Sequence, residues 1–208
     1  MAPGAAEPLI TRSSIQFASG TTPHGDLVLF DRELGLGKNA QLMLLALDGS
    51  RRLTLPLPTT SFERNGVVSP DGRWIAYESG FSGSGPFEIY VRPFPKTDGQ
   101  WKVSMGGGTQ PLWAPNGHEL FYVGPPPNNA LMIVHTDTDG TSWHPGTPMK
   151  FLEGYAAISP SRTYDVASDG RFIMIKPSAP DQTAAPSLKV VQHFDEELKR
   201  VAPPSGSR

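Results

Sequence analysis

Four apolar runs recur along the chain, and each directly follows a similar four-residue turn. In every run the third and fifth residues after the turn glycine are apolar, and so is the residue between them. A run that is apolar on both faces is typical of a strand buried between two sheets. The turns lie at residues 22–25, 69–72, 114–117 and 167–170, and the runs are centred on Leu29, Ala76, Phe121 and Met174.

Three further segments accompany each run in most of the four units. A second apolar run follows after a loop rich in glycine, proline or asparagine, which predicts a hairpin. The second runs are residues 42–47, 89–91, 131–134 and 188–191. Short β-like segments follow them at 52–55, 101–104 and 149–152, and short extended segments precede the turns at 66–69, 109–114 and 162–167. A complete unit therefore predicts four strands.

The spacing of the units identifies the architecture. The turns begin at residues 22, 69, 114 and 167, and a spacing of roughly 40–50 residues is the period of a four-stranded propeller blade. We therefore predict an all-β chain, a β-propeller of about four blades, at residues 14–58, 62–105, 109–153 and 162–194. The first and last turns are weaker copies, because His24 replaces the usual Asp or Asn and Ser168 replaces the proline.

Composition narrows the possible functions. The 208 residues carry a net charge of −2 without a basic stripe, so we expect no nucleic-acid partner. The chain has no cysteine, which excludes disulfides and cysteine-based metal sites. No apolar run approaches the roughly 18 residues of a membrane span, and residues 1–6 lack signal-peptide features. We expect disordered tails at 1–7 and 203–208, and a short helix at 194–201.

Several longer stretches resemble a known family. They are VSPDGRWIAYE at 68–78, IYVRPFP at 89–95, GGGTQPLW at 106–113, HELFY at 118–122 and FDEELKR at 194–200. Through them, residues 9–202 resemble the TolB-like, WD-related β-propeller repeats, and most closely those at the C-terminus of bacterial serine/threonine receptor kinases, notably from acidobacteria. The resemblance implies a ring of six or more blades in proteins that are often extracytoplasmic. This chain encodes about four blades and no kinase domain, and is expected to be part of a larger ring.

The ends of the repeat array suggest how the ring closes. The last unit lacks its outermost strand, and residues 9–11 resemble the outer strand of a preceding blade. We expect residues 9–11 to pair beside residues 188–191, because an open edge invites pairing. Pairing within one chain would make a four-bladed ring, and pairing between two chains would make an eight-bladed homodimer.

No catalytic set, metal site or cofactor site is predicted. The glycines at 106–108 could cradle a phosphate, but a strand rather than a helix follows them, which favours a turn. The residues around Ser84 do not have the spacing of a hydrolase elbow, and residues 137–140 are half of a calcium loop that lacks its distal glutamate. A metal site between His135, Asp137 and His144 is conceivable, although exposed histidines are the more ordinary reading. The four tryptophans favour packing between blades over stacking of sugars.

The remaining candidate is the central channel. The first residues of the innermost strands are expected to ring its mouth, and they are polar: Arg64, Asn65, Gln110, Arg162 and Tyr164. They form either a solvated rim or a site for a peptide or an anionic ligand. The sequence favours a non-catalytic module that binds a protein, peptide or small ligand. The alternatives are a small hydrolase or lyase acting at the channel mouth, and a truncated relic that assembles without a ligand.

Overall fold

The computed structural model describes residues 8–32, 40–55, 61–81, 84–96, 99–138, 142–153 and 161–175. Over these residues the regular structure consists of β-strands, without a helix. Predictions that lie outside the described residues are the strand at 188–191, the helix at 194–201 and the tails at 1–7 and 203–208.

The strands form four antiparallel sheets, which follow one another along the chain. Sheet one contains β1 (Ile15–Thr21), β2 (Leu27–Arg32), β3 (Ala40–Leu45) and β4 (Leu53–Thr54), and sheet two contains β5 (Phe62–Val68), β6 (Trp74–Phe81), β7 (Ser84–Pro93) and β8 (Trp101–Lys102), each in chain order. Sheet three contains β9 (Thr109–Trp113), β10 (Glu119–Val123), β11 (Leu131–Thr138), β12 (Trp143–Pro145) and β13 (Met149–Leu152). Its strand order is β12-β11-β10-β9, and β13 also pairs with β11. Sheet four contains β14 (Tyr164–Val166) and β15 (Phe172–Met174).

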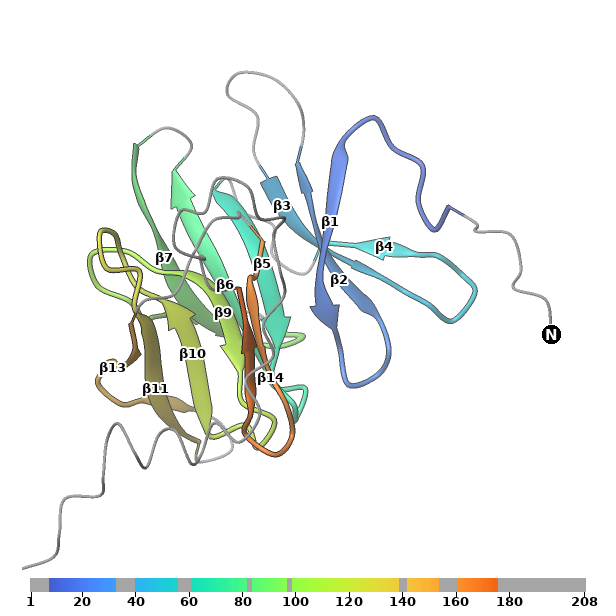
Figure 1. Ribbon diagram of the computed structural model, residues 1–208. Coiled ribbons are helices and arrows are strands. Elements are labelled where there is room, and N and C mark those ends of the chain that lie inside the picture. The colour runs from blue at the N-terminus through green and yellow to red at the C-terminus, as the bar shows by residue number, and fades with distance from the viewer. Residues whose placement is uncertain are drawn as a thin grey trace, which may run out of the picture.

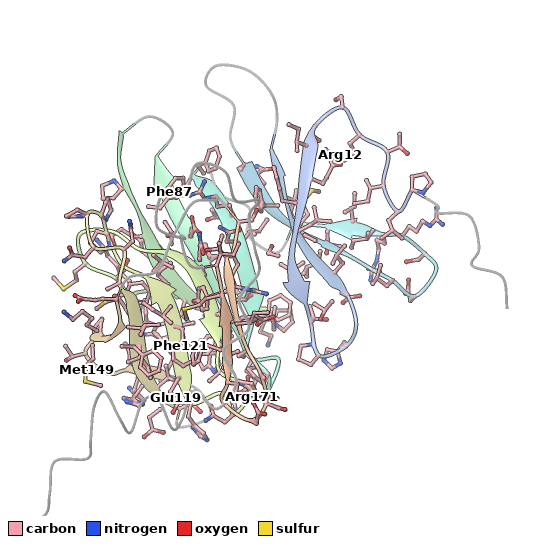
Figure 2. All side chains as sticks on the ribbon, viewed as in Figure 1. Arg12, Phe87, Glu119, Phe121, Met149 and Arg171 are labelled. Atoms are coloured by element: carbon pink, nitrogen blue, oxygen red, sulfur yellow. The ribbon has the colours of Figure 1, made fainter. Side chains whose placement is uncertain are left out.

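The four repeat turns adopt one geometry, including the two weaker copies. In each turn the glycine N–H donates to the carbonyl three residues earlier, at 2.8–2.9 Å. The four glycines have φ between 74° and 92°, a region that other residues rarely adopt. The turns at His24 and Ser168 therefore close in the same way as the turn at Asp71. Figure 2 shows Glu119 and Arg171, which follow two of these turns, at the same end of the molecule.

Neighbouring sheets pack face to face, which explains why the middle strands are apolar on both faces. Ile75 of β6 packs toward sheet one with Phe30, whereas Ala76 packs toward sheet three with Leu120, and both β6 residues are fully buried. Phe121 contacts Phe172 across sheets three and four, with ring centroids 5.0 Å apart. The sheets are set at successive angles (Figure 1), so the described chain has the β-propeller arrangement that the repeat predicts.

The tryptophans pack between sheets two and three, as predicted. Trp143 lies against both Trp101 and Trp113, with centroids 6.1 Å apart in each pair. Trp74 meets Trp101 edge-on at 5.6 Å. The cluster belongs to the interior, because Trp74, Trp113 and Trp143 are each at most 5% exposed.

The predicted strand at residues 9–11 is not formed, while its pairing with residues 188–191 stays a prediction. Residues 9–11 form no strand in the structure, and Ile10 instead packs on Leu29 and Leu45, on the face of sheet one that is turned away from sheet two. Arg51 Nη1 donates to the Pro8 carbonyl at 3.3 Å. Covering an apolar sheet face removes more apolar area from water than an isolated three-residue edge strand would. The proposed partner segment, residues 188–191, lies outside the described residues.

Candidate functional site

The innermost strands of the first three sheets share a distortion. Their pairing shifts register within the strand, near Ser19 in β1, Asn65 in β5 and Gln110 in β9. Asn65 and Gln110 occupy the left-handed region, with φ of 51° and 57°. Non-glycine residues rarely adopt this conformation, and surrounding contacts must hold it in place.

The side chain of Glu78 in β6 holds both left-handed residues. Its carboxylate accepts hydrogen bonds from Asn65 Nδ2 at 2.5 Å and from the Gln110 N–H at 2.7 Å. Arg64 Nε donates to the other oxygen at 2.6 Å, while the Glu78 side chain is fully buried. One carboxylate therefore ties sheet two to sheet three.

Burial and hydrogen bonding oppose each other at Glu78. Desolvation of the carboxylate raises its pKa above the ordinary value, while the charge of Arg64 and the hydrogen bonds from Asn65 and Gln110 act in the opposite direction. The burial contribution is the largest, so the pKa of Glu78 is raised. The ion pair is retained inside the protein at an energetic cost, which indicates a positioning role.

Gln110 extends this network to sheet four. Its side-chain Oε1 accepts hydrogen bonds from the Thr163 N–H at 3.0 Å and from Thr163 Oγ1 at 2.9 Å. The Tyr164 hydroxyl donates to the Gln110 carbonyl at 2.8 Å. Gln110 is only 1% exposed, so its amide joins strands and is not available to a ligand.

A cavity of about 340 Å³ lies where the inner strands converge. Its wall includes Ser19 from β1, Asn65 from β5, Pro111 from β9, and Arg162 and Tyr164 at β14. Arg162 Nη1 donates to the Ser19 carbonyl at 3.2 Å, which joins the first and last described sheets. Figure 1 shows β14 in front of β5 and beside β9, between the sheets that supply the wall.

The five residues singled out from the sequence take different places. Asn65, Arg162 and Tyr164 line the cavity. Arg64 pairs with Glu78 and lies 4.0 Å from the ring centroid of Phe87, which is labelled near the upper end of β7 in Figure 2. Gln110 is the buried connector. Arg64 and Asn65 were expected to be the first residues of their strand. This expectation is wrong, because β5 begins at Phe62.

Sequence reasoning missed two residues of this network, Glu78 and Thr163. Glu78 follows an apolar run on the face that carries Trp74 and Ala76. A carboxylate that continues a doubly buried strand was the available signal, since an unpaired charge is rarely buried. Thr163 gave no comparable signal, because threonine is common in strands.

The glycine-rich loop is filled by the protein itself. The carboxylate of Glu88 accepts hydrogen bonds from the N–H groups of Gly106 and Gly107, at 3.2 and 3.1 Å, and from the Ser104 hydroxyl. Lys102 Nζ lies 2.9 Å from the same side chain. Burial acts to raise the pKa of Glu88, but these hydrogen bonds and the charge of Lys102 outweigh it and lower the pKa. The N–H groups that could have cradled a phosphate are therefore occupied, and the loop is a turn.

The candidate metal residues do not gather into a site. Asp137 lies directly opposite His144 in the pairing of β11 with β12. His135 Nδ1 is 3.8 Å from a Glu119 oxygen. Over the described part of the chain, no three histidine or carboxylate side chains are placed to share a metal ion. In the same residues no helix is long and apolar enough to cross a membrane.

Comparison with known proteins places the fold. No family model and no curated protein matches the chain. A solved structure of a puromycin-hydrolyzing peptidase from Mycobacterium tuberculosis is similar, with a TM-score of 0.54 and 17% identity over 77% of this chain and 28% of that chain. A "putative TolB" from Agrobacterium tumefaciens is similar with a TM-score of 0.50 and 18% identity, over 69% of this chain and 53% of that chain.

These likenesses concern the fold. At 17% and 18% identity they carry no catalytic or binding residue across to this chain. The chain spans about a quarter of the peptidase and about half of the TolB structure. Together with the four radiating sheets, they show an all-β chain of the β-propeller type.

Proposed function

We propose that this chain is a non-catalytic binding module, which receives a protein, peptide or small ligand where its inner strands converge. The observation that carries the proposal is the cavity of about 340 Å³ beside Asn65, Arg162 and Tyr164. Its volume lies near the lower end of the roughly 300–1,000 Å³ of typical ligand pockets. A few polar groups on a rigid β-framework suit recognition better than chemistry.

The chemistry of the wall supports binding over catalysis. Among the described residues, the cavity wall contains no histidine. Its one carboxylate belongs to Asp165, which is exposed. Tyr164 already donates its hydroxyl proton to the Gln110 carbonyl. General acid–base catalysis needs a titratable group aimed at a reacting atom within about 3 Å, and none of these groups is arranged in that way.

The alternative function is a hydrolase or lyase that acts at the same cavity. The name of the puromycin-hydrolyzing peptidase describes that whole protein, of which the aligned part is 28%.

We propose that a propeller of this kind serves as the recognition part of a longer or assembled protein, such as the bacterial receptor kinases that its sequence resembles. We also propose that two copies complete one ring, and light scattering that finds only a monomer would contradict this assembly.

The test combines binding with turnover. Small neutral, cationic and anionic fragments are titrated into ¹⁵N-labelled protein, and we expect some of them to shift the amide resonances of Ser19, Asn65 and Tyr164. Chromogenic esters and peptide anilides should be hydrolysed no faster than in buffer. Turnover that is lost on substitution of Arg162 or Tyr164 would replace the binding proposal with the enzymatic one. Fragments that leave all three amides unchanged would refute binding at this cavity.

A further inference from the structure

We propose that the cavity selects ligands that carry a carboxylate, and that Arg162 is the residue that binds this group. The inference rests on the proposed binding function and names its ligand chemistry.

Arg162, unlike Arg64 and Arg171, has no carboxylate partner among the described residues. Arg64 pairs with Glu78 at 2.6 Å, and Arg171 pairs with Asp169 at 2.7 Å. Across the described ranges, Arg162 forms no ion pair, although its side chain is partly buried at the cavity. A partly buried cation gains more from an anionic ligand than a fully hydrated one does, because less water screens the attraction.

The guanidinium is held in place but keeps free donors. Its Nη1 donates to the Ser19 carbonyl at 3.2 Å, which anchors the side chain to β1. A guanidinium has several N–H donors in a planar fork, and that fork matches the two oxygens of a carboxylate. The contact with Ser19 uses only part of this capacity, so a carboxylate can bind without displacing it.

The rest of the wall fits a short apolar substituent. Ile173, Met174 and Ile175 contribute to the wall of the cavity, and Ile175 is 39% exposed. Pro111 contributes further apolar surface. The exposed Asp165 also borders the cavity, and its Oδ1 accepts a hydrogen bond from the Val166 N–H at 2.9 Å. Water screens an exposed charge of this kind, so it opposes an anion only weakly.

Charge balance favours a carboxylate over a phosphate. Arg162 is the one cationic side chain in the cavity wall formed by the described residues, and it neutralises the single charge of a carboxylate. A phosphate monoester carries nearly two charges near neutral pH and is commonly held by several donors or a helix N-terminus. The loop that could have supplied backbone donors, at Gly106 and Gly107, is filled by Glu88.

Two sources could supply the carboxylate, namely a free short-chain acid or the C-terminus of a peptide. The probes are hexanoate and the acetylated dipeptide acetyl-Ala-Leu with a free C-terminus, each compared with its neutral amide. Binding is followed by the amide resonances of Ser19, Thr163 and Tyr164. We expect each acid to bind about ten- to a hundredfold more tightly than its amide, the effect of a hydrogen bond to a charged group. Preference between the two acids identifies the source.

Substitution of the arginine makes the test specific. Arg162→Gln should weaken binding of the acids about ten- to a hundredfold and leave binding of the amides nearly unchanged. Arg162→Lys, which keeps the charge and loses the fork, should give an intermediate affinity and serves if the first variant fails to fold. Arg171→Gln is the matched control, because Arg171 lies at an exposed turn away from the cavity, and it should bind like the original protein.

The outcomes separate this inference from the broader proposal. Amides that bind as tightly as the acids, or an Arg162→Gln protein that keeps full affinity for the acids, would overturn the carboxylate assignment. Phosphate binding tighter than that of both acids would also overturn it. In these cases the cavity would still be a binding site. Failure of every charged and neutral probe to shift the three amides would instead refute the binding function itself.

Discussion

Removal of the Glu78 carboxylate is the most informative perturbation of the inner-strand network. This fully buried side chain accepts hydrogen bonds from Asn65 and from the Gln110 N–H, and it pairs with the partly buried Arg64. Glu78→Ala would leave the donors of Asn65 and Gln110 without their acceptor inside the protein. It would also release the conformational restraint on two left-handed residues.

The magnitude follows from the buried ion pair. Removing one partner of such a pair destabilises a protein by about 3–5 kcal/mol, because the other charge and its hydrogen-bonding neighbours remain. We expect Glu78→Ala to fall in this range. Glu78→Gln keeps an oxygen that can accept from Asn65 and Gln110, but it loses both the charge and the oxygen acceptor opposite Arg64 Nε. Its cost should be smaller, about 1–2 kcal/mol.

The assay is urea unfolding followed by tryptophan fluorescence, which reports the Trp cluster between sheets two and three. The midpoint should fall in the order original protein, Glu78→Gln, Glu78→Ala, without a change in the slope m. Arg64→Met is the partner variant, and the double variant Arg64→Met with Glu78→Gln should lose less stability than the sum of the two single changes. A Glu78→Ala protein within about 1 kcal/mol of the original would refute the positioning role.

The pH dependence of the same variants has a definite sign. The pKa of Glu78 is raised in the folded state, mainly by burial. At pH values between the unfolded pKa of about 4.3 and the higher folded pKa, the folded protein therefore binds more protons at this group than the unfolded protein does. Through this group, stability is therefore highest below the unfolded pKa and decreases as pH rises to the folded pKa. Glu78→Gln lacks this contribution, so its deficit relative to the original protein should be largest in acid and shrink as pH rises. A deficit that grows with pH would contradict the raised pKa.

Three further predictions concern the packing of the sheets. Gly66→Ala would place a Cβ 2.9 Å from both Cδ atoms of the buried Leu42, and it should lower the free energy of unfolding in urea by about 1–3 kcal/mol. Gly20→Ala is the control and should change stability little, because its Cβ would meet only Val67, at 3.8 Å. Equal effects of the two variants would contradict the close approach of sheets one and two. Trp143→Ala removes a side chain that is 1% exposed and should cost about 3–5 kcal/mol with loss of near-ultraviolet circular dichroism; an unchanged spectrum would refute the cluster. Burial, assisted by the charge of Glu88, raises the pKa of Tyr122 to about 12. In an absorbance titration of tyrosine ionisation, the Tyr122→Phe protein should therefore lack a component that titrates near pH 12 in the original protein. Loss of a component near pH 10 instead would contradict the burial of Tyr122.

The repeat made the main strands predictable, because each turn and the apolar run after it are encoded within about ten residues. The residues at Ile75 and Ala76 are both apolar and are both fully buried, on opposite faces of β6. The hairpins and the inter-blade packing of the tryptophans follow from the same local signals. The segment at residues 9–11 had a strand-like composition but forms no strand, and Ile10 packs on the apolar face of sheet one.

The site was less predictable, because it depends on how separate sheets are angled. Sequence position suggested Asn65, Arg162 and Tyr164, but not that Arg162 would contact Ser19, which lies 143 residues earlier. The bulges at Asn65 and Gln110 have no local glycine at the left-handed position. Glu78 holds the conformation of both residues. It lies on the strand next to Asn65, and in the sheet next to the one that contains Gln110. Such contacts between distant residues leave no periodic signal in the sequence.

Convergence of the inner strands around one cavity can be measured directly, since the chain has no cysteine of its own. A nitroxide attached at Asp165→Cys, an exposed position in the cavity wall, broadens amide resonances of nearby residues whatever their distance in sequence. The radial arrangement predicts broadening at Ala18 and Ser19 of β1 and at Asn65 of β5, as well as in β15. Broadening confined to β15 and the residues adjoining position 165 would mean that the first and last described sheets do not meet, and the cavity would not exist.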